Sequence, residues 1–489
     1  MTVSTAPRSS TTGPPREVNG PVAVAVLIYL GLSLQLLQVG IIPLLASIGE
    51  SVHTSPTTTS WLLTGGLLSG AVLLGLLSRL ADLIGKKPVI VLALALVLVG
   101  SLIGCFADSF GTLLIGRILM GALLPMLALP ESLASDTMSP QRAQQTIGAI
   151  HAGTGVGIGL GLLLGALAAG DGSSWRIYFV IGAVTSAVGI VAVLTLVHDS
   201  PARAPGRLDG PGAVLLAAGL TGVLLAIAEG STWHWSSGRV LGCLAGGVAL
   251  LVVWWFVESR TRYPLFSVQQ LLHPAVRWPY AITFLAAMGI YSALSALTRL
   301  AQTPTQAGAG FGWSPHSVAW YGLPTVIGSL LGLTIMRPLL KRGRRVTALV
   351  VGVSALILTF VILGPFVAHA SATLIAAGID SVGLTLTLAL AQIIVLRNVR
   401  AADSGIAVGL TIVLYAVGNS VGNAATASLF AAHSGPSGAP TFVAYRLAFL
   451  VSGLAALLAL GLCGLLARRR EDAAPDAAAD PTPVPAAAR

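Results

Sequence analysis

Fourteen long apolar runs constrain this chain more than any other feature of its sequence. A membrane-spanning helix needs about 20 consecutive, mostly apolar residues, and such runs recur along all 489 residues. They lie near 22–47, 57–80, 88–106, 110–133, 143–169, 176–197, 210–229, 237–256, 276–300, 314–340, 345–367, 371–396, 404–430 and 444–467. Only 9% of the residues are charged, whereas soluble domains carry about 25%. The sequence therefore predicts an all-α polytopic membrane protein, with the lipid bilayer as part of its solvent.

The basic residues orient these predicted helices. The formal net charge of +10 would also suit a nucleic-acid-binding protein. If the N-terminus is cytoplasmic, however, all but five of the 27 Lys and Arg residues fall on the cytoplasmic side. The five exceptions are Arg117, Arg176, Arg239, Arg299 and Arg446. This distribution is the positive-inside bias, so we expect both termini in the cytoplasm and no nucleic-acid partner.

A repeated loop indicates two copies of one unit. Residues 79–87 and 337–345 align without gaps, with Arg first, Gly at the seventh place and two cations after it. The runs near 276–300 and 314–340 therefore look like a second copy of the first two runs. Parallel repeats of this kind are typical of major facilitator transporters.

The spacing of the runs predicts five segments. We expect an N-terminal six-helix bundle over 21–200, two inserted helices with a connector over 201–275, and a C-terminal six-helix bundle over 276–470. The flanking segments, 1–20 and 471–489, are rich in small and polar residues and in Pro, which predicts disordered tails. The first apolar run is too long for the core of a cleavable signal peptide.

Residues 78–87 resemble the signature loop between helices 2 and 3 of the major facilitator superfamily. The matching residues are Leu80, Ala81, Asp82, Gly85, Lys86 and Lys87. The departures are Ser78, where Gly is usual, and Leu83, where a cation is usual. Gly85 permits a tight turn, and Asp82 can cap a helix end and pair with cations across the two halves. We expect Arg79, Asp82, Gly85, Lys86 and Lys87 to form a gating latch; the alternative is a solvated loop that only orients the chain.

A second resemblance centres on Arg117. Leu114-Ile-Gly-Arg117-Ile-Leu-Met-Gly121 is similar to a motif on the fourth helix of the family, with Met120 where Gln is common. In the family this Arg lies in or near the central cavity and takes part in proton transfer. A charge inside an apolar run is costly, so the alternative is a structural Arg that bonds backbone carbonyls.

Glycines recur every four residues in the run near 143–169. They are Gly153, Gly157, Gly161 and Gly165, with Gly155 and Gly159 widening the same groove. Such a face lets a neighbouring helix approach closely. The antiporter motif of the family, Gly-Pro-x-x-Gly-Gly, sits at this place, but here it reads Gly161-Leu162-Leu-Leu-Gly165-Ala166, without the Pro. We expect helix packing here, and Gly418 and Gly422 are the counterpart face in the other half.

Further segments resemble the fourteen-helix drug:proton antiporter branch of the family. They are Ser174-Trp175-Arg176, Arg207-Leu-Asp209-Gly-Pro-Gly212, Glu229-Gly230 with Trp233 and Trp235, and Glu258 to Leu265. Branch members often carry an Asp in helix 1, about nine residues before a Pro. Here the Pro is Pro43 and the corresponding place is Leu34, so only Gln35 and Gln38 are polar there and could bond a substrate.

Asp380 is the strongest candidate for the proton site. It is nine residues into a run that starts near Ser371, about 13 Å down the helix axis and close to the membrane midplane. An ionisable group at this depth is a functional hypothesis by default. Gly383 and Thr387 share its face and would leave room for water or substrate. We predict that Asp380 binds the coupled proton or a cationic substrate, with Arg117 and Gln35 facing the same cavity; the alternative is a neutral acid that packs helices.

Glu131 is the rival carboxylate. It shares a predicted helix face with Arg117 but lies about 21 Å further down, near the cytoplasmic end. We expect it to pair with the basic signature loop.

Other motifs predict no chemistry. Gly418-Asn-Ser420-Val-Gly422 fits the hydrolase elbow, but it lies within an apolar helix. The chain has no P-loop and no His-Glu-x-x-His, and its three scattered cysteines imply neither disulfides nor a metal site. We expect no role for His151 or His198.

Together these features predict a major facilitator fold, two six-helix bundles plus two inserted helices. The resemblance implies a proton-coupled exporter of drug-like or secondary-metabolite molecules in a bacterial inner membrane. The expected partners are a small-molecule substrate and protons, with no cofactor, metal or nucleotide, and we expect a monomer rather than an enzyme. Transport of one small nutrient or metabolite is the alternative, and a membrane-embedded enzyme or sensor is a remote one.

Overall fold

The computed structural model is a bundle of long helices whose axes are roughly parallel. It describes residues 20–54, 56–168, 174–200, 209–230, 232–261, 276–307, 309–314, 317, 320, 322–399, 404–435 and 439–472. Within them, 14 helical spans are long and apolar enough to cross a membrane, which confirms the number predicted. The tails and the connectors over 201–208 and 262–275 lie outside the described residues.

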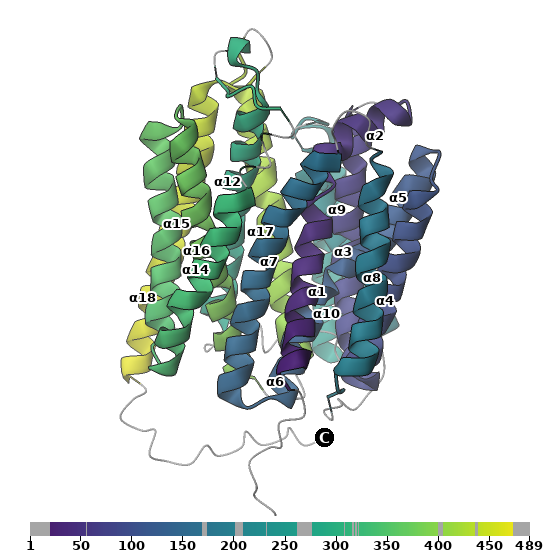
Figure 1. Cartoon of the computed structure of the whole chain (residues 1–489), viewed down its shortest axis with the longest axis vertical. Coiled ribbons are helices and arrows are strands. Elements are labelled where there is room, and N and C mark those ends of the chain that lie inside the picture. The colour runs from purple at the N-terminus through teal and green to yellow at the C-terminus, as the bar shows by residue number, and fades with distance from the viewer. Residues whose placement is uncertain are drawn as a thin grey trace, which may run out of the picture.

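The first six spans form one group, which we call the N-terminal bundle (Figure 1). Its elements are α1 (Pro21–Val39), η1 (Ile42–Leu44), α2 (Leu45–Ser51), α3 (Pro56–Ile84), α4 (Lys86–Cys105), α5 (Phe110–Met120), η2 (Gly121–Leu123), α6 (Pro125–Thr137), α7 (Pro140–Ala168) and α8 (Arg176–Leu196). Two further helices, the inserted pair, are α9 (Gly210–Glu229) and α10 (Gly238–Arg260). They pack against each other, and α9 also contacts α3 and α17.

The last six spans lie beside the first group and form the C-terminal bundle (Figure 1). Its elements are α12 (Arg277–Gln302), η3 (Thr305–Ala307), α14 (Gly322–Lys341), α15 (Arg345–Phe366), α16 (Ala370–Arg397), α17 (Ser404–Ala432) and α18 (Phe442–Asp472). The bundles meet where α7 packs against α14 and α16, and where α3 and α6 pack against α17. We call this contact surface the seam.

The two bundles repeat one design. Gly85, between α3 and α4, has φ +119°, and Gly343, between α14 and α15, has φ +71°. Both values lie in the region that only Gly adopts readily, so each copy of the loop turns at the same place. The glycine faces repeat as well, since α7 packs against α1 and α17 packs against α12.

The fourth span is not one straight helix. It breaks into α5, the 3₁₀ turn Gly121–Leu123, and α6. Pro125 begins α6 and Pro130 lies inside it; a proline has no N–H to donate to the preceding turn, which favours a break or a kink. Arg117 and Glu131 therefore lie on two separate helical segments.

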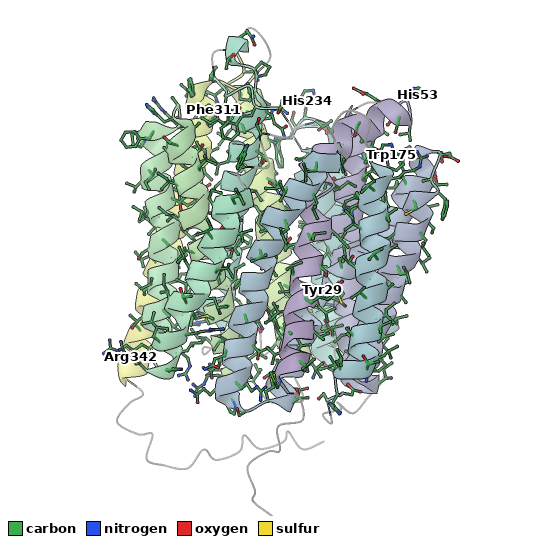
Figure 2. All side chains as sticks on the ribbon, viewed as in Figure 1. Tyr29, His53, Trp175, His234, Phe311 and Arg342 are labelled. Atoms are coloured by element: carbon green, nitrogen blue, oxygen red, sulfur yellow. The ribbon has the colours of Figure 1, made fainter. Side chains whose placement is uncertain are left out.

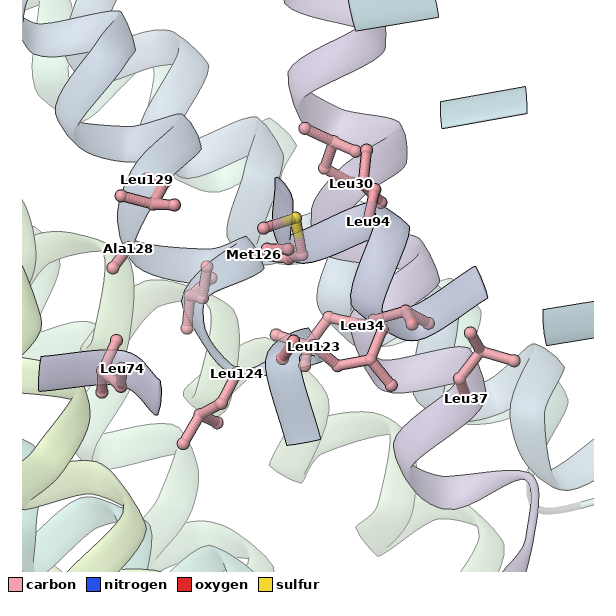
Figure 3. Close-up of a cluster of buried hydrophobic side chains, with 14 of the residues drawn as sticks. Leu30, Leu34, Leu37, Leu74, Leu94, Leu123, Leu124, Met126, Ala128 and Leu129 are labelled. Carbon is pink, nitrogen blue, oxygen red and sulfur yellow. The ribbon is translucent and has the colours of Figure 1, made fainter. Parts of the chain in front are cut away.

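Leucines from several helices fill the space around this break (Figure 3). Leu123 and Leu124 belong to the same buried cluster as Leu30, Leu34 and Leu37 of α1. Leu34 is 2% exposed, so the place where branch members often carry an acid is packed with hydrocarbon. In lipid, the gain from such packing comes from van der Waals contact between the helices rather than from removal of apolar surface from water.

The even number of spans leads to a prediction about topology. An even count returns the chain to the side on which it started, and Arg342 lies at the same end of the bundle as the start of α1 (Figure 2). We call this the basic end. Reporter fusions at Arg470 and within 257–275 should both report the cytoplasm, and a control fusion after Asp108 should report the opposite side. An external signal at Arg470 would contradict the inserted-pair arrangement.

Candidate functional site

Glycines of α7 form two packing faces rather than one widened groove. Gly153, Gly157 and Gly161 face the backbone of α1, and Gly165 faces that of Gly40 just after it; a Cβ at Gly161 would lie 2.7 Å from the Leu36 carbonyl oxygen. Gly155 and Gly159 point the other way: a Cβ at Gly159 would lie 2.5 Å from the Gly322 carbonyl oxygen of α14. One helix therefore binds its own bundle through one glycine face and lies against the other bundle through the second.

The counterpart face of α17 behaves in the same way. A Cβ at Gly418 would meet the Phe284 carbonyl oxygen of α12, and one at Gly422 would meet that of Met288. Ser420 donates a hydrogen bond to Ala416 O within the same helix. The Gly-x-Ser-x-Gly motif therefore lies in a helix and not at the strand-to-helix turn of a hydrolase nucleophile.

A cluster of polar side chains crosses the seam near mid-depth. The Gln35 amide of α1 donates to the hydroxyl oxygens of Tyr291 (3.2 Å) and Tyr415 (3.1 Å). The two tyrosine hydroxyls also bond each other, and their rings meet edge to face with centroids 5.5 Å apart. Tyr291 lies on α12 and Tyr415 on α17, so Gln35 ties the N-terminal bundle to two helices of the C-terminal bundle. Gln38, one turn further, is partly buried.

Asp380 adds a carboxylate to this cluster. It lies ten residues after the start of α16, about 15 Å along the axis, and it interacts electrostatically with Tyr291. Its Oδ1 is buried and accepts no hydrogen bond from the residues that the structure describes. The free space predicted beside it is wrong: Gly383 packs on Leu356 and Gly352 of α15, and Thr387 fills the same contact.

Glu131 does not pair with the signature loop, contrary to our prediction. Its Oε1 lies 2.8 Å from Nε2 of His151, a residue of α7 for which the sequence predicted no role. The two residues meet where α6 packs against α7. Tyr415 also lines the small cavity that contains this pair, together with Gln392 of α16.

Arg117 points into the N-terminal bundle, so the prediction that it shares a cavity with Asp380 is wrong. Its Nε donates to Leu62 O (3.0 Å), and one terminal nitrogen donates to the Tyr178 hydroxyl (2.7 Å). Tyr178 in turn donates to Leu37 O. Arg117 therefore clamps α3, α8 and α1 together, which matches the structural alternative.

The signature loop is buried rather than solvated. Lys86 is 1% exposed and bonds Asp136 at the end of α6, while Asp82, 2% exposed, lies 3.9 Å from Lys86. Lys87 donates its backbone N–H to Asp199 after α8. These pairs lock the ends of α3, α4, α6 and α8 together. Arg79 is buried with them at 4% exposure. A pairing of Asp82 across the seam stays a prediction.

The second copy of the loop does reach across the seam. Arg345 Nε donates to Gln144 Oε1 of α7 at 3.1 Å. Arg345, Lys341 and Arg397 line a cleft of about 570 Å³ at the basic end, between α7 and helices of the C-terminal bundle.

A second cleft opens at the other end of the molecule. It measures about 470 Å³ and is lined by Ile42, Arg299 of α12 and Phe430 of α17. Between the two clefts, the cavity beside Glu131 and His151 measures only about 10 Å³, close to the space of one water molecule. Among the residues that the structure describes, the centre is therefore closed beside Glu131 and His151, with a cleft at each end.

Four residues of this site were missed by sequence reasoning, namely His151, Tyr291, Tyr415 and Gln392. Each is a polar group inside an apolar run, and Tyr hydroxyls in such places usually need a partner. That signal could have marked them as candidates. Which of them meet depends on how each helix is rotated about its axis, and this cannot be read from one helix alone.

The sequence of this chain is similar to one protein family and to several transport and resistance proteins. The family model described as Major Facilitator Superfamily matches residues 22–303. The chain is 27% identical to the lincomycin resistance protein of Streptomyces lincolnensis over 447 residues, 87% of this chain and 88% of that protein. It is 28% identical to the uridine/deoxyuridine transporter of Lactococcus lactis subsp. cremoris (strain MG1363) over 55% of this chain and 57% of that protein. It is 27% identical to the puromycin resistance protein pur8 of Streptomyces alboniger over 63% of this chain and 60% of that protein. The last two matches span little more than half of each relative.

A solved structure supports the same architecture. The human organic anion transporter MFSD10 (TETRAN) superposes with a TM-score of 0.66 at 19% identity, over 91% of this chain and 100% of that one. At this identity the similarity concerns the fold alone.

Proposed function

The chain belongs to the Major Facilitator Superfamily, and we propose that it is a proton-coupled exporter of drug-like or antibiotic-like small molecules. As a multi-pass membrane transporter it needs two states in which the centre opens alternately to each face. The closed centre and its two end clefts support such a cycle. The basic end would face the cytoplasm, because positive charge is retained on that side.

The similarity to the lincomycin resistance protein carries this proposal, because it extends over nearly the whole chain. The names of shorter matches agree, since a methylenomycin A resistance protein and a cephamycin export protein are both about 30% identical over partial lengths. The uridine/deoxyuridine transporter favours a second candidate, transport of one nucleoside-like metabolite.

The central polar cluster is the proposed binding region. Asp380 would bind the coupled proton or a cationic substrate, since a carboxylate in an apolar surrounding is stable only when it is protonated or paired. Gln35, Tyr291 and Tyr415 bond one another in the closed centre. In an open state, the same groups would be free to bond a substrate.

Drug resistance tests this function against its alternative. Expression in a bacterial strain without its major efflux pumps should raise the inhibitory concentration of lincomycin or puromycin severalfold, and a protonophore should restore drug accumulation. The control is the same strain with an empty vector. Unchanged resistance together with faster uptake of labelled uridine would favour the nucleoside transporter instead.

A further inference from the structure

Glu131 and His151 are a buried acid–base pair in the N-terminal bundle. Glu131 is 0% exposed and His151 4%, and the nearest atoms of the two side chains are 2.8 Å apart. Apart from this contact, neither the carboxylate oxygens nor the ring nitrogens have a hydrogen-bond partner among the residues that the structure describes. The same holds for Nε2 of Gln392, on the far wall of the cavity. Buried polar atoms without partners are rare and need an explanation.

The C-terminal bundle closes this pair from water. The cavity wall opposite the pair consists of Thr283 of α12, Leu388 and Gln392 of α16, and Thr411, Ile412 and Tyr415 of α17. All six belong to the bundle that must move in an alternating-access cycle. Separation of the bundles would therefore expose the pair.

The neighbouring charged groups have other partners. Lys86 of α4 bonds Asp136, and Arg117 of α5 bonds Leu62 and Tyr178. Arg345 of α15 bonds Gln144, Arg79 and Asp82 of α3 also have partners, and Asp380 interacts electrostatically with Tyr291. Tyr415 is the one other titratable side chain on the cavity wall within the described residues. The charge of the pair is therefore balanced within the pair itself.

This balance requires one proton. With one shared proton, the pair is neutral, whether the proton is on the carboxylate or on the second ring nitrogen. Without it, a net negative charge would lie in an apolar, closed cavity, which is strongly unfavourable. The closed centre is thus compatible with the loaded pair and opposes the unloaded one.

We propose that Glu131 and His151 form a second proton-binding site, separate from Asp380, that loads and unloads as the seam opens. The site rests on the proposed function, since only a proton-coupled cycle would use it. On the face with the lower proton concentration, the N–H or O–H bond of the pair breaks and the proton passes to water. On the other face, the pair takes a proton from water before the centre closes.

Infrared difference spectroscopy of purified, substrate-free protein can test the site directly. Spectra recorded between about pH 5 and pH 9 span the range in which such groups titrate. We expect a titrating signal that is absent in E131Q, because this substitution removes the carboxylate of the site. In H151Q the signal should remain and move to lower pH, because the shared proton loses one of its two binding places. D380N should leave it unchanged.

Two results would overturn the proposal: an E131Q spectrum identical to the wild type, or a signal that H151Q leaves in place at the same pH. Helical content and elution volume show whether each variant is folded. If E131Q does not fold, H151Q alone tests the proposal. Because no drug is present, the titration stands apart from the proposed function. If the signal is found but no drug is exported, the proton site holds and the substrate class is wrong.

Discussion

Replacing Asp380 with asparagine should abolish proton-driven export while the protein still folds and inserts. Asparagine has nearly the shape of aspartate but cannot carry a proton, so the site should keep its shape and lose the titratable group that interacts electrostatically with Tyr291. We expect resistance to fall to the level of the empty vector. Drug accumulation in inverted vesicles with an imposed pH gradient should be lost.

Asp108 provides the matched control. It is also an aspartate, but its side chain is 90% exposed and pairs with Arg176. This pair lies near the end of the bundle opposite the basic end. Exposed pairs of this kind contribute about 0–1 kcal/mol, so Asp108→Asn should pump normally. If Asp380→Asn pumps as well as this control, Asp380 is not the coupling site, and the Glu131–His151 pair becomes the first candidate.

Gly157→Leu and Gly161→Leu should each abolish transport and leave the protein in the membrane. Both positions face the α1 backbone, where even a Cβ would meet a carbonyl oxygen. Overpacking costs about 1–3 kcal/mol or more when the neighbour cannot move, and backbone moves less readily than a flexible side chain. Displacing α1 would also displace Gln35, which joins the two bundles.

The control is Gly461→Leu, because Gly461 of α18 has open space where its side chain would lie. It should transport as the wild type does. Membrane fractions and resistance measured side by side separate lost activity from lost protein. Wild-type transport in both α7 variants would show that close packing of α7 on α1 is not required.

The fold could be predicted because lipid imposes strict rules on sequence. Each span must be about 20 residues long and apolar, so the fourteen runs were visible in the chain itself. The repeated loop was visible for a similar reason, since the tight turn demands glycine at Gly85 and Gly343 in both copies.

The side-chain partners could be predicted only in part. The four-residue spacing correctly placed Gly153 to Gly165 on one packing face, but it could not show that Gly155 and Gly159 face α14. The partner of Glu131 follows a break in the span, the 3₁₀ turn at Gly121–Leu123, which the periodicity of the sequence did not reveal. The environment of Asp380 was mistaken because helical periodicity tells which residues share a face, not which neighbouring helix covers that face.

Transport by purified protein in liposomes tests the central claim most directly. The liposomes are loaded with acidic buffer and diluted into a more alkaline one, so that protons can leave as drug enters. We predict that radiolabelled lincomycin accumulates inside while the gradient lasts, leaves when nigericin dissipates the gradient, and does not accumulate with Asp380→Asn. Drug accumulation that does not depend on the pH gradient, or that depends on a sodium gradient instead, would contradict proton-coupled export.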